Sequence, residues 1–98
     1  MDSQSVIRIL REHEQELKAA GIIHLRLFGS TARGQSSPGS DIDLLADFDL
    51  SKKLTRVSIG HIQSRLEDLL GANIDLTSAE WMKDPVRSAA LTEALLAF

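Results

Sequence analysis

The apolar residues near the start of the chain recur at the spacing of a helix. One stripe within residues 3–20 comprises Val6, Ile7, Leu10 and Leu17. Such a stripe predicts an amphipathic helix that buries one face. Asp2 or Ser3 is suited to capping its start, and Gly21 fits the left-handed position at which helices commonly end.

Three shorter segments are predicted as strands. Residues 22–28 (IIHLRLF) alternate with a period of two, which is the spacing of a strand with one buried face. That face is expected to comprise Ile23, Leu25 and Leu27. Residues 41–48 (DIDLLADF) and residues 72–77 (ANIDLT) are predicted as the second and third strands.

Helical spacing returns twice after the second strand. Apolar residues predict a long helix over residues 55–70, which Gly71 ends. Its stripe comprises Ile59, Ile62, Leu66 and Leu69. Asp84 and Pro85 suit the cap and first turn of a last helix that runs into the tail SAALTEALLAF. The stripe of that helix would include Val86, Ala90, Ala94 and Phe98.

Gly and Ser residues mark the connection between the first two strands. Residues 29–39 (GSTARGQSSPG) are turn-rich and leave space for a short helical turn around residues 31–34. The predicted order is therefore helix, strand, short helix, strand, helix, strand, helix. Short strands between amphipathic helices imply an α/β (α+β) fold, with one sheet and helices packed against it. At 98 residues, we expect a single domain spanning residues 1–98.

Composition excludes several classes of protein. The formal net charge of −3 argues against a generic nucleic-acid binder, because such proteins need a basic face. The chain has no cysteine, which excludes disulfides and thiolate metal sites. No apolar run approaches the ~20 residues of a membrane span, and the start of the chain is unlike a signal peptide. We therefore expect a soluble, cytoplasmic protein with no direct binding of nucleic acid or membrane.

Two aspartates open the second predicted strand one pleat apart. Asp41 and Asp43 point to the same face, with their Cα atoms ~6.6 Å apart. If the carboxylates approach to ~5 Å, their repulsion costs about 3 kcal/mol at an effective dielectric of ~20. Mg²⁺ would relieve that repulsion, because it binds one or two carboxylates together with substrate phosphates. Taken alone, the pair is better explained as a charged strand edge that resists aggregation.

A third aspartate changes the balance. Asp75 repeats the pattern in NIDLT, between aliphatic residues that would face the core. If its strand lies beside residues 41–48, three carboxylates converge on one patch. Carboxylates that clamp two ions ~3.5–4 Å apart are a recurring device for in-line phosphoryl chemistry. Taken alone, Asp75 would be read as an exposed strand residue.

The Gly-Ser step after the first strand is a candidate phosphate site. Gly29 lets backbone amides approach an anion closely, and Ser30 and Thr31 offer donors at the start of a helical turn. Arg33 follows one turn later with a guanidinium that suits phosphate oxygens. An ordinary capped turn with a surface arginine explains each feature separately. Together with the aspartates, they predict a site that holds triphosphate at one end and metal at the other.

Gly29-Ser30, ten intervening residues and Asp41-x-Asp43 together resemble the signature of the DNA polymerase β nucleotidyltransferase superfamily. The strings GSTARG and SDIDLLADF, with NIDLTS further on, look like its minimal nucleotidyltransferase (MNT) branch. The resemblance covers nearly the whole chain and implies a palm-like core with a small mixed sheet. It also implies that Asp41 and Asp43 bind Mg²⁺ and that Asp75 completes the metal site and assists the attacking hydroxyl.

The resemblance also implies a reaction. Gly29 and Ser30 would hold the β- and γ-phosphates, and Arg33 falls where the branch tends to have arginine. Members of the branch transfer a nucleoside monophosphate from ATP, or another nucleotide triphosphate, to an acceptor hydroxyl. They commonly pair with a small helical HEPN-domain toxin, and some adenylylate a tyrosine of that toxin. We therefore expect an Mg²⁺-dependent protein adenylyltransferase that acts as an antitoxin by AMPylation.

Two alternatives stay open. The chain would be a non-enzymatic antitoxin if it neutralised its partner by binding alone. A small-molecule nucleotidyltransferase that acts on an antibiotic is less favoured, because the chain has no room for the extra lobe that binds such an acceptor. Base and acceptor choice would then depend on a partner protein or on a homo-oligomer.

Several other residues are interpreted as structural. His13, His24 and His61 do not cluster in the sequence and are expected in structural or surface roles. Trp81 and Met82 are expected to fill the core edge or form a partner surface rather than stack on a base. The apolar tail of the last helix is either an interface or packed on the protein's own sheet.

Overall fold

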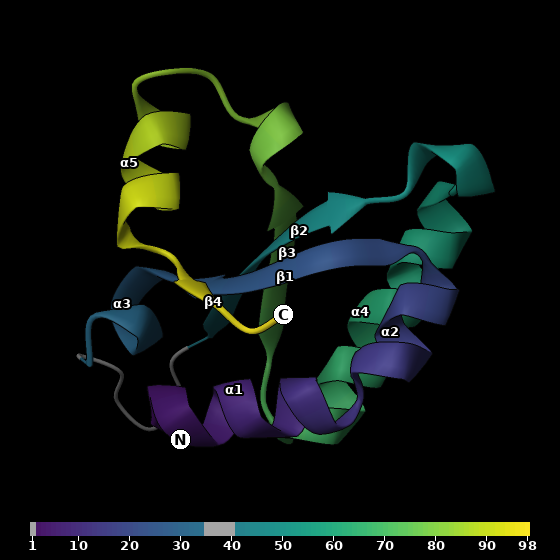
Figure 1. The fold of residues 1–98 in the computed structure, drawn as a ribbon, viewed down its shortest axis with the longest axis horizontal. Helices are drawn as coiled ribbons and strands as arrows, with labels where there is room; N and C mark the ends of the chain where they lie inside the picture. The colour runs from purple at the N-terminus through teal and green to yellow at the C-terminus, as the bar shows by residue number, and fades with distance from the viewer. Residues whose placement is uncertain (1, 35–40) are drawn as a thin grey trace.

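A four-stranded mixed sheet organises the chain, and helices cover it. The computed structural model describes residues 2–34 and 41–98 (Figure 1). Its strands are β1 (Ile22–Phe28), β2 (Ile42–Phe48), β3 (Ile74–Ser78) and β4 (Leu95–Leu96). Its helices are α1 (Ser3–Glu12), α2 (Glu14–Ala20), α3 (Gly29–Ala32), α4 (Arg56–Leu70) and α5 (Val86–Glu93), with short 3-10 turns η1 (Leu50–Lys52) and η2 (Ala79–Trp81). The predicted α+β fold is confirmed.

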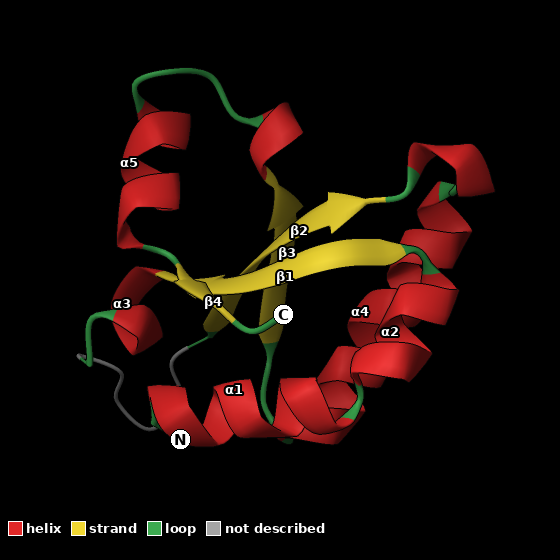
Figure 2. Ribbon diagram, viewed as in Figure 1, coloured by secondary structure: helices red, strands yellow, loops and turns green. Residues whose placement is uncertain are grey.

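The strands lie in the order β3-β2-β1-β4 (Figure 2). β1 pairs antiparallel with β2 on one side and with β4 on the other. β2 and β3 are parallel, and α4 makes the crossover between them. A parallel pair needs such a long connection, because a tight hairpin can only join antiparallel strands.

The main core lies between one face of the sheet and the helices α1, α2 and α4. Helical spacing puts apolar side chains on the inner faces of these helices, and strand alternation puts others on the facing side of the sheet. The fully buried members of this cluster are Val6, Leu10, Leu17, Ile22, Leu25, Leu27, Leu44, Ala46, Leu66 and Ala97. Leu45 alternates with its neighbours and is fully buried on the opposite face, where η2 packs on β2 and α5 packs on β1.

The helix predicted over residues 3–20 is two helices. His13 leaves the helical conformation, with φ −111° and ψ 18°, and α1 and α2 diverge there (Figure 1). Its ring Nδ1 lies 2.9 Å from the carbonyl oxygen of Ile9, so the side chain contacts the backbone of the helix that it ends. The single apolar stripe in the sequence is therefore divided between two helices. Val6 and Leu10 are the buried residues of α1, and Leu17 is the buried residue of α2.

The first strand is confirmed in extent but not in its buried face. Leu25 and Leu27 are buried as predicted, whereas Ile23 is 44% exposed and Ile22 takes its place at 1%. The pairing register of β1 with β2 shifts between Ile22 and His24. One extra residue in a strand reverses the faces of the residues beyond it, which explains the error.

The long helix over residues 55–70 is confirmed as α4. The hydroxyl of Thr55 caps it by accepting from the Ser58 N–H at 3.1 Å, and Gly71 ends it in the left-handed conformation with φ 63°. The third strand begins at Ile74, two residues later than predicted. The short helix after β1 begins at Gly29 rather than near Thr31.

The last helix is shorter than predicted. The residue at the N-cap is Pro85 rather than Asp84, although the Asp84 carboxylate just before it accepts from Ser88 N–H at 3.2 Å. The helix α5 ends at Glu93, and the backbone becomes extended at Ala94. The following residues pair with β1 as β4, and Arg11 Nε donates to the carbonyl oxygen of Ala97 at 2.7 Å. These long-range hydrogen bonds override the local helical pattern. Among the residues that the structure describes, no helix has the length and apolar character needed to cross a membrane.

Candidate active site

Parallel pairing of β2 with β3 brings two of the predicted aspartates side by side. Asp43 and Asp75 are direct partners in the strand register. The residues on either side of each aspartate are buried: Ile42, Leu44, Ile74 and Leu76. Strand alternation therefore turns both carboxylates away from the main core. Asp75 is exposed to solvent, whereas Asp43 is partly buried.

The surroundings of Asp43 disfavour its charged form. Partial burial raises the pKa of the Asp43 carboxyl, and the charges of Asp75 and then Asp41 raise it further. A hydrogen bond with the Asp75 side chain acts in the same direction, and the charge of Arg33 opposes these effects. Asp41 immediately precedes β2 and is exposed. The structure thus brings together Asp43 and Asp75, which are 32 residues apart in the sequence. The convergence of Asp41 with this pair stays a prediction.

Gly29 lies against this carboxylate pair. It is the first residue of α3, and the preceding Phe28 is the register partner of Asp43. Its φ of +74° is a conformation that side chains rarely adopt. A Cβ at this position would collide with the Asp43 carboxylate and lie 3.0 Å from its Cγ. Both the backbone conformation and the missing side chain are therefore required for the turn to approach the aspartates.

Two hydroxyl residues follow Gly29 in α3. Ser30 is partly exposed, next to the glycine that touches Asp43. Thr31 is buried, and its Oγ1 has no hydrogen-bond partner among residues 2–34 and 41–98. The part played by Ser30 in holding phosphate stays a prediction.

Arg33 ends α3 and makes a contact that the sequence did not suggest. Its Nη1 lies 3.1 Å from Oε2 of Glu93, at the far end of α5. The sequence offers no signal for Glu93, because the predicted helix continues through Ala94 to Phe98 and places Glu93 inside it.

The comparisons with known proteins identify the family. A family model described as a nucleotidyltransferase domain matches residues 7–96. The chain belongs to this family. The prediction that it is a nucleotidyltransferase enzyme is confirmed, and so is its resemblance to the MNT branch.

Individual relatives of this nucleotidyltransferase agree with the family model. The protein adenylyltransferase MntA of Thermococcus cleftensis is 30% identical over 93 residues, which are 94% of this chain and 92% of the relative. A solved structure provisionally named a minimal nucleotidyltransferase is 34% identical, with a TM-score of 0.79, over 97% of this chain and 95% of that one.

A more distant structure shares the fold. It is a chain from the complex of a tri-AMPylated Shewanella oneidensis HEPN toxin with an MNT antitoxin, with a TM-score of 0.62. The match covers 94% of this chain and 71% of that chain at 15% identity.

The donor chemistry of the site suits a hard divalent cation. Three carboxylates offer oxygen ligands of the kind that Mg²⁺ prefers. The pKa of Asp43 is raised first by burial and then by the charges of Asp75 and Asp41, and a cation would offset that repulsion. Within residues 2–34 and 41–98, no group of three or more His, Cys, Asp or Glu side chains is arranged as a ready-made metal site. The nucleotidyltransferase therefore has the ligand types for Mg²⁺ without a preformed cluster of three ligands among these residues.

The other residues singled out in the sequence lie elsewhere. Trp81 stacks on Phe48 with ring centroids 5.6 Å apart. Phe48 is at the opposite end of β2 from Asp43, five residues and roughly 17 Å away. The two rings line a hollow of about 250 Å³ together with residues of η1, α4 and the loops beside them. His13 and His24 contact backbone carbonyl oxygens of Ile9 and Phe98.

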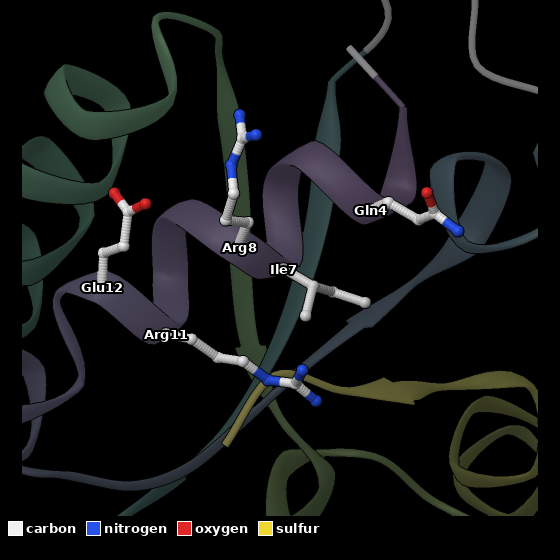
Figure 3. A pocket seen from close by; sticks show the side chains of 5 residues that line it. All are labelled: Gln4, Ile7, Arg8, Arg11 and Glu12. Carbon is white, nitrogen blue, oxygen red and sulfur yellow. The ribbon is translucent and has the colours of Figure 1, made fainter.

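A second hollow, of about 510 Å³, lies along α1 (Figure 3). Arg8 and Glu12 extend from the helix in one direction, whereas Arg11 extends the other way, toward the C-terminal segment. The guanidinium of Arg11 is already engaged by the carbonyl oxygens of Ala97 and Leu96, at 2.7 and 3.5 Å. We assign this hollow a structural role, because its arginine fixes the β4 segment to α1.

Proposed function

We propose that this nucleotidyltransferase moves AMP from ATP to a tyrosine hydroxyl of a HEPN toxin and thereby acts as an antitoxin. The observation that carries the proposal is the in-register pairing of Asp43 with Asp75 against the Gly29 turn. The name of the Thermococcus relative and the AMPylated toxin in the Shewanella complex support AMP as the group transferred and a HEPN toxin as the acceptor.

Asp41, Asp43 and Asp75 would hold Mg²⁺, which when bound would neutralise charge on the triphosphate. Gly29 and Ser30 would contact the β- and γ-phosphates through backbone amides and the hydroxyl, and Arg33 would add a charge-assisted contact.

The transfer step involves one bond made and one broken. The acceptor oxygen forms a bond to the α-phosphorus of ATP, and the bond from that phosphorus to pyrophosphate breaks. Asp75 is the exposed member of the carboxylate pair, so it is the one that an acceptor from another protein would meet. We propose that Asp75 accepts the proton from the attacking hydroxyl.

The chain cannot supply a tyrosine acceptor itself, because its sequence contains no tyrosine. A tyrosine-specific reaction would therefore require a second protein. This composition favours transfer between chains over self-modification of tyrosine.

A transfer assay tests the proposal. The purified protein is incubated with a HEPN toxin, MgCl₂ and ATP labelled on the α-phosphate, and the toxin is analysed by mass spectrometry for added AMP. We expect AMP on a toxin tyrosine with the wild type and none with Asp43→Asn. Absence of label with the wild type, or equal labelling by Asp43→Asn, would overturn the proposal.

Neutralisation by binding alone is the competing function. The exposed apolar side chains of Leu91, Leu95 and Leu96, on α5 and β4, favour a protein-binding surface. The double variant Asp41→Asn, Asp43→Asn separates the two functions in a growth assay with the toxin. Loss of protection indicates that transfer is needed, whereas full protection indicates that binding is sufficient.

A further inference from the structure

The carboxylate of Glu93 forms an ion pair with Arg33, whose guanidinium is proposed to bind the nucleotide. Arg33 and Glu93 are 60 residues apart in the sequence, so their ion pair ties the end of α3 to the end of α5. Figure 1 shows that these two helices stand at the same edge of the sheet. The side chains are 45% and 49% exposed, so a solute can reach the pair from solvent.

The helix that carries Glu93 does not account for its charge. Glu93 is the last residue of α5, where the helix dipole is negative and the last turn contains no basic residue. A carboxylate there opposes the dipole, whereas lysine or arginine would complement it. The Glu93 carboxylate instead forms an ion pair with Arg33, and this contact stabilises its charge.

Arg33 also acts on the carboxylate cluster. Its positive charge lowers the pKa of Asp43, in opposition to burial and to the neighbouring aspartates. The guanidinium thus contacts Glu93 and also acts electrostatically on Asp43. A triphosphate entering this site adds further negative charge, and arginine binds phosphate oxygens through paired, charge-assisted hydrogen bonds. An ion pair that is half exposed on both sides is weak enough to be exchanged for such contacts.

We propose that Glu93 is a competing anion in the nucleotide site: it holds Arg33 when no nucleotide is bound and gives it up to the triphosphate. This inference rests on the proposed function, in which Arg33 contacts phosphate. Glu93 is then a positioning residue that sets the affinity for nucleotide, because each binding event must break its contact with Arg33. Removing its charge removes this competition for the guanidinium.

The experiment measures binding of a non-hydrolysable ATP analogue with Mg²⁺ by calorimetry. Glu93→Gln is expected to bind the analogue more tightly than the wild type, by between about 1.5-fold and 5-fold, which is the range for an exposed ion pair. In turnover assays the KM for ATP falls by the same factor, while kcat changes less. Glu93→Asp keeps the charge on a shorter side chain and is expected to fall between Glu93→Gln and the wild type.

Two further variants show whether the effect passes through Arg33. In an Arg33→Gln background, replacing Glu93 by Gln is expected to change affinity little, because the partner is already lost. The matched control is Glu16→Gln. It breaks the Arg65–Glu16 pair, whose side chains are 47% and 44% exposed and which joins α2 to α4. It removes the same charge from the chain and is expected to leave nucleotide affinity unchanged.

The outcomes separate this inference from the proposed function. If Glu93→Gln binds the analogue equally or more weakly than the wild type, Glu93 does not compete and the inference is wrong. It is also wrong if Glu16→Gln or the Arg33→Gln background gives the same gain, because the effect is then general electrostatics. If the wild type and every variant fail to bind the analogue, both the inference and the proposed function are overturned.

Discussion

The two ends of β2 are built on opposite principles. At its start, Asp43 is pressed against Asp75 and the Gly29 turn, and the carboxylates repel one another. At its end, Phe48 stacks on Trp81, and the two rings line a hollow that apolar and charged side chains share. The Asp43 end of β2 therefore lowers the stability of the fold, whereas the stacked rings at the Phe48 end raise it. The comparison teaches that the aspartate end persists because the rest of the sheet holds it, as is common at functional sites.

The largest expected effect is on the buried core that supports both ends of β2. Leu44 is fully buried in the main core directly after Asp43. Leu44→Ala removes buried methyl groups and leaves a cavity, so we expect the free energy of unfolding to fall by about 2–5 kcal/mol. Urea denaturation measures this loss. A cost below about 1 kcal/mol would contradict the assigned role of this strand in the core.

A substitution at Gly29 is expected to affect only the end of β2 that carries Asp43. In Gly29→Ala, the new Cβ meets the Asp43 carboxylate in a conformation with φ +74°. We expect the free energy of unfolding to fall by about 1–3 kcal/mol because of the strain, together with loss of nucleotide binding. Gly71→Ala is the matched control, because its φ is also positive at +63° but no atom lies within 4 Å of the added Cβ. It is expected to lose some stability and keep nucleotide binding.

A smaller effect is expected at the aromatic end. Trp81 is 57% exposed and contributes its stacking on Phe48. Trp81→Ala should lower the free energy of unfolding by about 0.5–1.5 kcal/mol and leave nucleotide affinity unchanged. Denaturation and calorimetry on the same sample check both parts. A large loss of nucleotide affinity would show that the two ends of β2 are not independent.

The smallest expected effect has the opposite sign. The pKa of Asp43 is raised in the folded protein, so the folded state holds its proton to higher pH than the unfolded state does. Between the ordinary carboxyl pKa, about 3.9, and the raised value, stability falls as the pH rises.

Asp43→Asn removes this titration. We expect it to be more resistant to urea than the wild type at pH 7, with a smaller difference near pH 4. Urea midpoints at the two pH values measure the effect. If Asp43→Asn were less stable than the wild type at pH 7, the carboxylates would not repel as described.

Local patterns predicted the elements whose stability is local. The apolar spacing of α4, its Thr55 cap and its Gly71 stop lie within one segment, and the structure confirms them. Strand alternation also placed Asp43 and Asp75 on outward positions, and their meeting needed only that the two strands be neighbours.

The errors arose where distant residues decide the conformation. β4 exists because its backbone pairs with β1 and Ala97 accepts a hydrogen bond from Arg11, and neither partner is near in sequence. The break at His13 lets α1 and α2 pack on the sheet along two different axes. The register shift near Ile23 depends on how β1 pairs with β2. Glu93 was missed for the same reason, since its partner Arg33 comes from a different helix.

The central claim is that Asp75, which a crossover helix brings beside Asp43, takes part in nucleotidyl transfer. The most direct measurement is the rate of AMP transfer to the toxin by Asp75→Asn, compared with Asp68→Asn, which changes an exposed aspartate on α4. We predict that Asp75→Asn loses transfer by about a thousand-fold or more, as expected when several kcal/mol of transition-state stabilisation are removed, while Asp68→Asn keeps it. Transfer by Asp75→Asn at the wild-type rate would contradict the account.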